Sequence, residues 1–272
     1  MNSNKKITVL ATAGLCNRMR TLASAISYIR NNKFTESKYL WERNKDCYAF
    51  FDELFQDIKG GEICRVSNFY LKESNKRTLF IPRLCRKFIF DIEIDDAKTI
   101  TDASKFAAKI NGKKNIFISS YSQFGGYNVN ANWADLFKPI DKLQKRIDRL
   151  TSCFNDSVIG LHIRRTDSVK SIESSTDDKF FDVIDKELEL NNDVKFYLAT
   201  DSKEVIQEMK NKYGDKIISH NFDLSRNTTN GMEDAVVDLY VLASTSKIYG
   251  SFWSSYSEAA SYIYNKPLII VK

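Results

Sequence analysis

Two adjacent arginines end an apolar run in the second half of this 272-residue chain. The run SVIGLHI (157–163) is typical of a buried strand, and Arg164 and Arg165 follow it directly. Side chains alternate along a strand, so His162 and Arg164 share one face and Arg165 lies on the other. Because ligands of open α/β sheets bind at the carboxyl ends of the strands, a guanidinium there could hold a diphosphate and stabilise a departing nucleotide. We assign Arg164 to a ligand and Arg165 to structure; the alternative is that both only pair with acids such as Asp201.

A turn dense in hydroxyl groups is the second candidate. It joins a predicted strand to a predicted helix that opens with Ser255 and Glu258 in the spacing of a capping box. The N–H groups at a helix start favour phosphate, and Ser251 and Ser254 could add donors. The competing interpretation is that these serines only form the turn and the cap, Ser255 in particular.

Three further positions have weaker signals. Gly14, where the first strand turns into the first helix, permits an unusual φ and a close backbone approach, and Asn17 is a plausible helix cap. Asp238 lies at the border of the apolar stripe of a helix predicted over 231–245. Its carboxylate could accept paired hydrogen bonds from the N1 and N2 edge of guanine, or it could be a solvated helix residue. We interpret Asp201 as a helix cap, because Asp201 and Glu204 have the spacing of a capping box.

Composition excludes several classes of protein. The 41 Lys+Arg and 35 Asp+Glu residues are interleaved, which argues against a nucleic-acid binder. Five scattered cysteines without a CxxC pair, and only two histidines, favour neither a zinc site nor a disulfide framework. The alternating acids at 91–96 have no His or Asn companion, so we expect no metal. With no apolar run of about 20 residues, we expect a cytoplasmic protein without a transmembrane segment, and peripheral membrane contact stays open.

The elements that must position these residues alternate between strand and helix, as in an α/β protein with parallel sheets. The chain lacks GxGxxG and the P-loop, which argues against a dinucleotide dehydrogenase or a Walker NTPase. An apolar stripe behind Pro139 predicts a helix that joins two domains, 1–150 and 151–272. The stretch 48–114 is only weakly periodic. The other elements that we predict are strands at 7–10, 115–118, 157–163, 194–200, 247–250 and 267–271, and helices from 17, over 180–190, from 201, over 231–245 and over 255–264.

In this order, the motifs resemble those of the fucosyltransferase-like superfamily, specifically the α1,6-type group with the rhizobial nodulation fucosyltransferase and the core N-glycan enzymes. The matching motifs are Gly14-Leu-Cys-Asn17-Arg18, His162-Ile-Arg164-Arg165-Thr-Asp167, Tyr197-Leu-Ala-Thr-Asp201, Val237-Asp238-Leu239 and Gly250-Ser-Phe-Trp-Ser-Ser255. The resemblance implies a GT-B fold, in which two Rossmann-like domains with parallel sheets face a cleft. It also implies inverting transfer of fucose from GDP-fucose, with no metal or other cofactor required.

The resemblance also implies roles for single residues. Arg164 matches the arginine that grips the donor diphosphate, and His162 and Asp238 match guanosine contacts. The turn on the phosphate and base side matches Ser251, Phe252 and either Ser254 or Ser255. Asn17, beside Gly14, resembles the residue of the N-terminal domain that reaches the phosphates. Glu173 is the candidate acceptor base, although its spacing from Asp167 departs from the family pattern.

The expected function is therefore transfer of fucose from GDP-fucose to a hydroxyl of a glycan acceptor, with the C-terminal domain holding the donor and the N-terminal domain facing the acceptor. One alternative keeps the fold and changes the donor to GDP-mannose or another nucleotide sugar. A second alternative, suggested by the displaced Glu173, is a non-catalytic protein that binds a nucleotide or a glycan.

Overall fold

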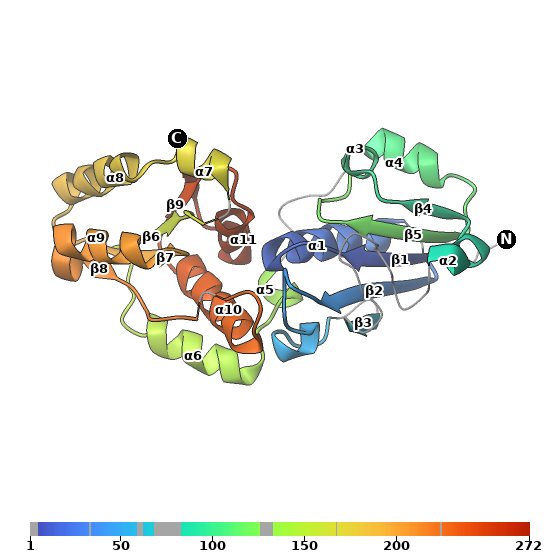
Figure 1. Cartoon of the computed structure of the whole chain (residues 1–272), viewed down its shortest axis with the longest axis horizontal. Coiled ribbons are helices and arrows are strands. Elements are labelled where there is room, and N and C mark those ends of the chain that lie inside the picture. Colours follow the sequence, from blue (N-terminus) through green and yellow to red (C-terminus); the bar gives the residue numbers. More distant parts are fainter. Residues whose placement is uncertain are drawn as a thin grey trace. The chain divides into compact units, whose positions relative to one another are not determined.

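The chain forms two compact units in the computed structural model (Figure 1). The first unit is Met1–Ile140 with Ser225–Met232, and the second is Asp141–Leu224 with Glu233–Lys272. The helix at 141–151, which the sequence analysis predicted to join the two domains, lies in the second unit. The structure describes residues 5–32, 34–58, 62–67, 83–125, 133–166, 168–223 and 225–272.

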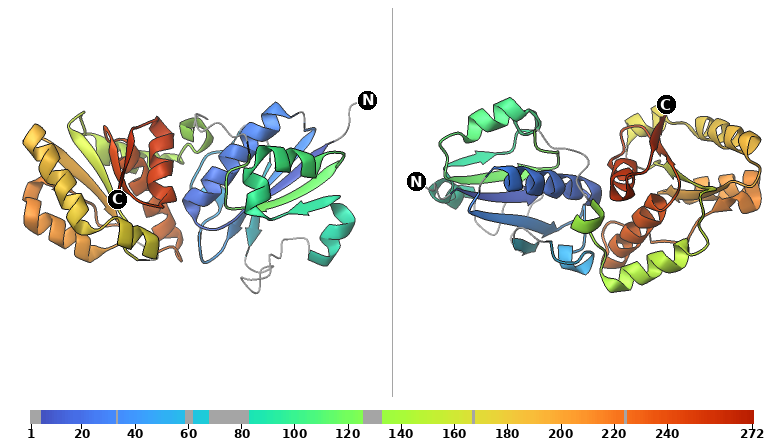
Figure 2. Two further views of the ribbon diagram at one scale, coloured as in Figure 1. Left: turned by 90° about the horizontal axis from the view of Figure 1, so that it is seen from above. Right: turned by 180° about the vertical axis from the view of Figure 1, so that it is seen from behind.

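The first unit is built on a five-stranded parallel sheet in the order β3-β2-β1-β5-β4. Its strands are β1 (Lys6–Ala11), β2 (Glu36–Arg43), β3 (Glu62–Ser67), β4 (Ile92–Ile94) and β5 (Asn115–Ser120). Its helices are α1 (Leu15–Asn31), η1 (Phe51–Glu53), α2 (Arg83–Ile89), α3 (Ala97–Thr101), α4 (Ala103–Ile110) and α5 (Trp133–Leu136). α1 runs beside the central strand β1, so the loop between them lies at the carboxyl edge of the sheet (Figure 2).

The weakly periodic stretch at 48–114 contains short elements that polar contacts hold in place. Asp96 and Asp102 cap α3 and α4. Asp91 accepts hydrogen bonds from the backbone N–H groups of Lys114 (2.7 Å) and Asn115 (3.0 Å). Asp91 and Asp96 therefore serve as a backbone acceptor and a cap, while Glu93 pairs with Arg86. The helices of this stretch have three to eight residues, which is too short to set up a readable helical period.

The second unit carries another five-stranded parallel sheet, in the order β10-β9-β6-β7-β8. Its strands are β6 (Val158–Ile163), β7 (Lys195–Thr200), β8 (Ile217–Ile218), β9 (Ile248–Ser251) and β10 (Leu268–Val271). Its helices are α6 (Asp141–Thr151), α7 (Val169–Ser174), α8 (Asp177–Leu190), α9 (Lys203–Tyr213), η3 (Gly214–Lys216), α10 (Thr229–Ala243, whose first residues belong to the first unit) and α11 (Ser255–Tyr264). All six residues of the central strand β6 are buried.

The two faces of β6 are packed differently. Ile159, Leu161 and Ile163 join an apolar core with side chains of α8 and α9. The opposite face carries Gly160, where an added Cβ would lie 2.6 Å from Thr245 Oγ1 and 2.7 Å from Leu242 Cδ1. α10 can therefore lie directly on the sheet at this point. α11 does the same over Gly250 of β9, where an added Cβ would lie 2.6 Å from Ser257. The face of β6 that carries Gly160 and His162 thus meets α10 at Leu242 and α11 at Tyr256.

The predicted fold class is confirmed, since both units are α/β with parallel sheets. Several predicted elements match closely: the helix at 255–264 coincides with α11, and the helix predicted over 231–245 begins two residues earlier and ends two earlier, as α10. The two-residue strand β8 was not predicted. In the described parts of the chain, no helix combines the length and the apolar character that crossing a bilayer requires.

Candidate functional site

The loop after β6 is held by Asp201 and Arg165. The Asp201 carboxylate accepts the backbone N–H of Arg165 at 2.7 Å and the Thr166 hydroxyl at 2.6 Å. The Arg165 guanidinium pairs with Asp177 and donates to the carbonyl of Ser175 at 2.8 Å. Arg165 therefore has the structural role that the sequence predicted. The prediction that Asp201 caps a helix is wrong, because Ser202 is the N-cap of α9 and its hydroxyl accepts from the next turn.

Arg164 follows the end of β6 directly, and it is half-buried. Its backbone N–H donates to Ser251 Oγ at 3.1 Å, and the Ser251 hydroxyl donates to the carbonyl of His162, also at 3.1 Å. Ser251 is fully buried, so one hydroxyl ties the end of β9 to the end of β6. Because a hydroxyl has a single proton, Ser251 acts in this structure by positioning the backbone of Arg164.

The turn from β9 into α11 is fastened on both sides. The N–H of Phe252 donates to Ser175 Oγ at 2.8 Å, and its carbonyl accepts the Ser171 hydroxyl at 2.6 Å. The N-cap of α11 is Ser254, whose hydroxyl accepts from the N–H of Tyr256. The predicted capping box at Ser255 and Glu258 is therefore wrong by one residue, because α11 starts at Ser255. The first backbone N–H groups of an α-helix lack partners within the helix, which makes this end attractive to an anion.

Asp238 lies on α10 between two tyrosine hydroxyls. Tyr197 of β7 donates to Asp238 Oδ1 at 2.5 Å, and Tyr256 of α11 lies 2.8 Å from Oδ2 while also contacting the carbonyl of Ala235. Burial raises the pKa of Asp238 to about 6, although the two tyrosine hydrogen bonds act in the opposite direction. Asp238 is thus ionised at neutral pH. Each carboxylate oxygen can accept two hydrogen bonds, so the tyrosines leave acceptor capacity for a ligand.

His162 is stacked on Tyr256, with 4.9 Å between the ring centres and 25° between the ring planes. Only 7% of its surface is exposed, and its Nδ1 is buried without a hydrogen-bond partner. The pKa of His162 is lowered to about 4, mainly by desolvation; Asp201 acts in the opposite direction, and Arg164 and Arg165 add to the lowering. The ring is therefore neutral at pH 7. A buried polar atom without a partner is uncommon, and a bound ligand would supply one.

These contacts join four of the predicted residues of the second unit into one cluster: His162, Arg164, Asp238 and Ser251. Ser251 bonds to the backbones of His162 and Arg164, and Tyr256 links His162 to Asp238. Glu173 lies on the exposed side of α7, the helix whose Ser171 holds the carbonyl of Phe252. The sequence analysis missed Tyr197 and Tyr256. A usable signal did exist for Tyr197, because a tyrosine inside a buried strand needs a partner for its hydroxyl.

Gly14 and Asn17 belong to the first unit, where the loop after β1 differs from the prediction. Gly14 is the N-cap of α1 with an ordinary φ of −73°, and the left-handed residue is Ala13, with φ 65°. The expectation of an unusual φ at Gly14 is wrong, and so is the cap at Asn17, which lies within α1. Arg18 holds the loop: it is fully buried, and its guanidinium donates to the carbonyl of Ala13 at 2.6 Å and to Asn44 Oδ1 at 2.8 Å.

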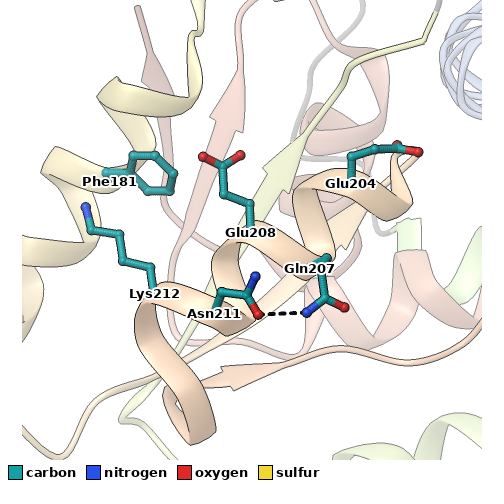
Figure 3. Close-up of a pocket in the computed structure, with 6 residues that line it drawn as sticks. All are labelled: Phe181, Glu204, Gln207, Glu208, Asn211 and Lys212. Atoms are coloured by element: carbon teal, nitrogen blue, oxygen red, sulfur yellow. Dashed lines mark hydrogen bonds between the residues drawn. The ribbon is translucent and has the colours of Figure 1, made fainter.

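A hollow of about 660 Å³ lies away from these residues, between α8 and α9 (Figure 3). It is lined by Phe181, Glu204, Gln207, Glu208, Asn211 and Lys212. The Lys212 ammonium lies 4.2 Å from the centre of the Phe181 ring and 3.6 Å from Asp185. Gln207 and Asn211 bond to each other. The polar groups of this hollow are mostly paired within the unit, so it does not compete with the site at the end of β6.

One family model matches part of the chain. Residues 127–255 match the family model for the N- and catalytic domains of α-(1,6)-fucosyltransferases. The matched segment includes β6, β7, α10 and β9, and ends at the first residue of α11. No curated protein matches the sequence.

Solved structures match over nearly the whole chain. NodZ α-1,6-fucosyltransferase soaked with GDP-fucose gives a TM-score of 0.65 at 18% identity, over 96% of this chain and 92% of NodZ; NodZ has also been solved from Bradyrhizobium. A variant of Arabidopsis thaliana FUT1 in complex with GDP gives a TM-score of 0.66 at 15% identity, over 98% of this chain and 70% of the FUT1 chain. Apo POFUT1 gives a TM-score of 0.60 at 9% identity, over 100% of this chain and 99% of the POFUT1 chain.

The two parallel-sheet units and the structural matches give the chain a GT-B fold. Within this fold, residues 127–255 match the α-(1,6)-fucosyltransferase family model, which indicates a glycosyltransferase.

Proposed function

We propose that this chain transfers fucose from GDP-fucose to a hydroxyl of a glycan acceptor, with inversion at the anomeric carbon and without a metal or other cofactor. The single observation that carries the proposal is the joined cluster of His162, Arg164 and Ser251 at the carboxyl end of β6. It lies in the segment that matches the α1,6-fucosyltransferase family, and similar structures contain GDP or GDP-fucose.

The proposed reaction is an in-line displacement. The acceptor oxygen forms a bond to the anomeric carbon while the bond from that carbon to the β-phosphate oxygen breaks. The electron pair stays on the phosphate, and the acceptor proton passes to a base. Negative charge therefore grows on the leaving GDP, and Arg164 together with the N-terminus of α11 stabilises it most in the transition state.

The proposed guanosine contacts are Asp238 and His162. A carboxylate that is ionised at neutral pH can accept from both N1–H and N2–H of guanine, and the unpartnered Nδ1 of His162 gives the nucleoside a further polar contact. Phe252 would complete the turn on the base side, with Ser254 and Ser255 beside the phosphates. A site built around such acceptors rejects a base without the matching donors, because its buried carboxylate would stay unpaired.

The acceptor side of the proposal rests on fewer contacts. We propose the first unit, with Gly14 and Asn17 in the loop after β1, as the acceptor-side domain, with Asn17 reaching the phosphates. Glu173 is our candidate for the base, because it is an exposed carboxylate on the helix that fastens Phe252. A GDP-mannose donor is the second candidate, since the residues above contact the GDP part of the donor and leave the sugar open.

A binding series tests the nucleotide assignment. Isothermal titration with GDP, IDP, ADP and UDP should rank GDP first, IDP lower because hypoxanthine lacks the N2 amine, and ADP and UDP last. Asp238→Asn should remove most of the preference for GDP, while Lys186→Ala, which removes an exposed charge from α8, should leave the ranking unchanged. Equal affinities for GDP and ADP in the native chain would contradict the guanosine contacts.

A product analysis tests the chemistry. The chain is incubated with GDP-fucose or GDP-mannose and a panel of glycans, and the configuration of the new linkage is read by NMR. From GDP-fucose, in which the sugar is β-linked, an α-linked product supports inversion and a β-linked product contradicts it; from GDP-mannose, in which the sugar is α-linked, the two outcomes are reversed. Tight GDP binding with neither transfer nor donor hydrolysis across the panel would favour a binding protein.

A further inference from the structure

We propose that Tyr197 and Tyr256 are positioning residues for guanine recognition, in which their hydroxyl groups orient the Asp238 carboxylate and keep it ionised, so that donor binding persists in mildly acidic conditions. The inference rests on the proposed function, because it takes guanine as the ligand of Asp238. It adds two residues that do not themselves contact the donor in the proposed arrangement.

The geometry favours this role. The two hydroxyls approach different oxygens of the same carboxylate from different elements: Tyr197 from β7 reaches Oδ1, and Tyr256 from α11 reaches Oδ2. Tyr197 is fully buried, and Tyr256 is held by its ring stack with His162. A carboxylate gripped at both oxygens cannot rotate about its Cβ–Cγ bond without breaking a hydrogen bond. Its remaining lone pairs therefore keep one direction, which is the property that recognition of the N1–H and N2–H pair requires.

The charges around Asp238 explain why the hydroxyls matter. Burial favours the neutral acid, and Asp234, one turn away on α10, adds a like charge that acts in the same direction. Asp234 itself pairs with Arg146 of α6. The groups on the other packed elements are the two tyrosines, His162 of β6, whose ring stacks on Tyr256 and is neutral at pH 7, and His220, which packs against Tyr197. The tyrosine hydroxyls are the groups that lower the pKa of Asp238, because they donate to the ionised form.

A direct test measures Asp238 without any ligand. Aspartate labelled with ¹³C at the side-chain carboxyl carbon allows each carboxyl group to be titrated by NMR. The signal of Asp238 is the one that is lost in Asp238→Asn. Tyr197→Phe and Tyr256→Phe each remove one oxygen atom and keep the ring. The midpoint of the Asp238 titration should rise in each variant. An unchanged midpoint in both variants would overturn the proposal whether or not the chain binds GDP.

The second test measures recognition. The GDP affinity of each variant is divided by the GDP affinity of the native chain at each pH between 8 and 6. The titration of the nucleotide's own phosphate affects both affinities equally and therefore cancels in this ratio. With the native pKa at about 6, affinity should fall about twofold over this range, and a rise of one unit in a variant should make the fall about tenfold. The ratio should therefore drop about fivefold between pH 8 and pH 6.

A matched control comes from another tyrosine–carboxylate pair. The Tyr249 hydroxyl donates to Glu187 on the apolar side of the same sheet, so Tyr249→Phe also removes a hydroxyl–carboxylate bond. Its ratio to native should stay flat with pH, whereas an equal slope would assign the effect to general destabilisation and overturn the proposal. If the native chain binds no GDP while the NMR midpoints rise, the proposed guanine ligand fails, and only the electrostatic effect of the tyrosines stands.

Discussion

Truncating Arg164 separates the chemistry from the fold more cleanly than any other change in the site. Two backbone contacts anchor residue 164: its N–H lies 3.1 Å from Ser251 Oγ, and its carbonyl accepts from the Arg165 guanidinium at 2.8 Å. Arg164→Ala keeps both backbone groups. The loop is also held by Asp201 and Arg165, which the substitution leaves in place. We therefore expect the folded structure of the variant to match that of the native chain, with a small change in its unfolding temperature.

The expected loss of activity follows from the charge on the departing GDP. A preorganised donor aimed at developing charge contributes about 3–4 kcal/mol in the transition state, so kcat should fall by about 100-fold to 1,000-fold in Arg164→Ala. Arg164→Lys keeps the charge and loses the two-pronged geometry, so it should recover only part of the rate. The assay is GDP release at saturating donor, with circular dichroism to verify folding.

The comparison also needs a charge control. Lys186→Ala removes an exposed positive charge from α8 of the same unit and should leave kcat unchanged. A kcat within threefold of native in a folded Arg164→Ala variant would refute the assignment of Arg164 to the leaving group. An equal loss in Lys186→Ala would mean that the net charge of the unit, and not the position of one guanidinium, governs the rate.

Three further outcomes are expected. Gly160→Ala should lower the free energy of unfolding by about 1–3 kcal/mol, because its Cβ would lie 2.6 Å from Thr245, whereas Gly14→Ala meets an ordinary 3.8 Å contact and should be nearly neutral; urea unfolding checks both. His162→Gln should become more stable relative to the native chain as the pH falls from 6.5 to 4, by up to about 3 kcal/mol. The reason is that the native histidine has a pKa of about 4 when folded, so it takes up a proton at a higher pH in the unfolded chain, which favours unfolding. A pH-independent difference in urea unfolding would contradict this. Transfer should continue unchanged in excess EDTA, and a loss that Mg²⁺ or Mn²⁺ restores would contradict metal independence.

The long, periodic elements could be predicted from the sequence alone. Strand β6 is an apolar run interrupted only by His162, and α6 carries a regular stripe, of which Leu143 and Ile147 are buried. Both patterns are readable in the sequence because burial of one or both faces of an element requires apolar residues there. By contrast, β4 has three residues and β8 has two, and each is defined by its pairing with one neighbouring strand, β5 or β7. No local pattern encodes such strands.

Helix caps and side-chain partners were harder to predict. Neighbouring residues such as Ser254 and Ser255, or Asp201 and Ser202, are both chemically able to cap, and the choice depends on the backbone of the preceding loop. In the structure Asp201 is drawn to the N–H of Arg165, so the cap passes to Ser202. The tyrosine pair around Asp238 comes from two elements that the sequence separates by 59 residues, which only the tertiary fold brings together.

The double use of the Ser251 hydroxyl bears on how this enzyme could be engineered. Cysteine or alanine at position 251 would remove the hydroxyl whose hydrogen bonds join the ends of β6 and β9. Threonine would need room for a methyl group at a fully buried position. Trp253 is the opposite case, exposed and in the left-handed region with φ 58°, where glycine or asparagine relieves the backbone. A mutant library aimed at new donors should therefore diversify 253 freely and hold 251 constant.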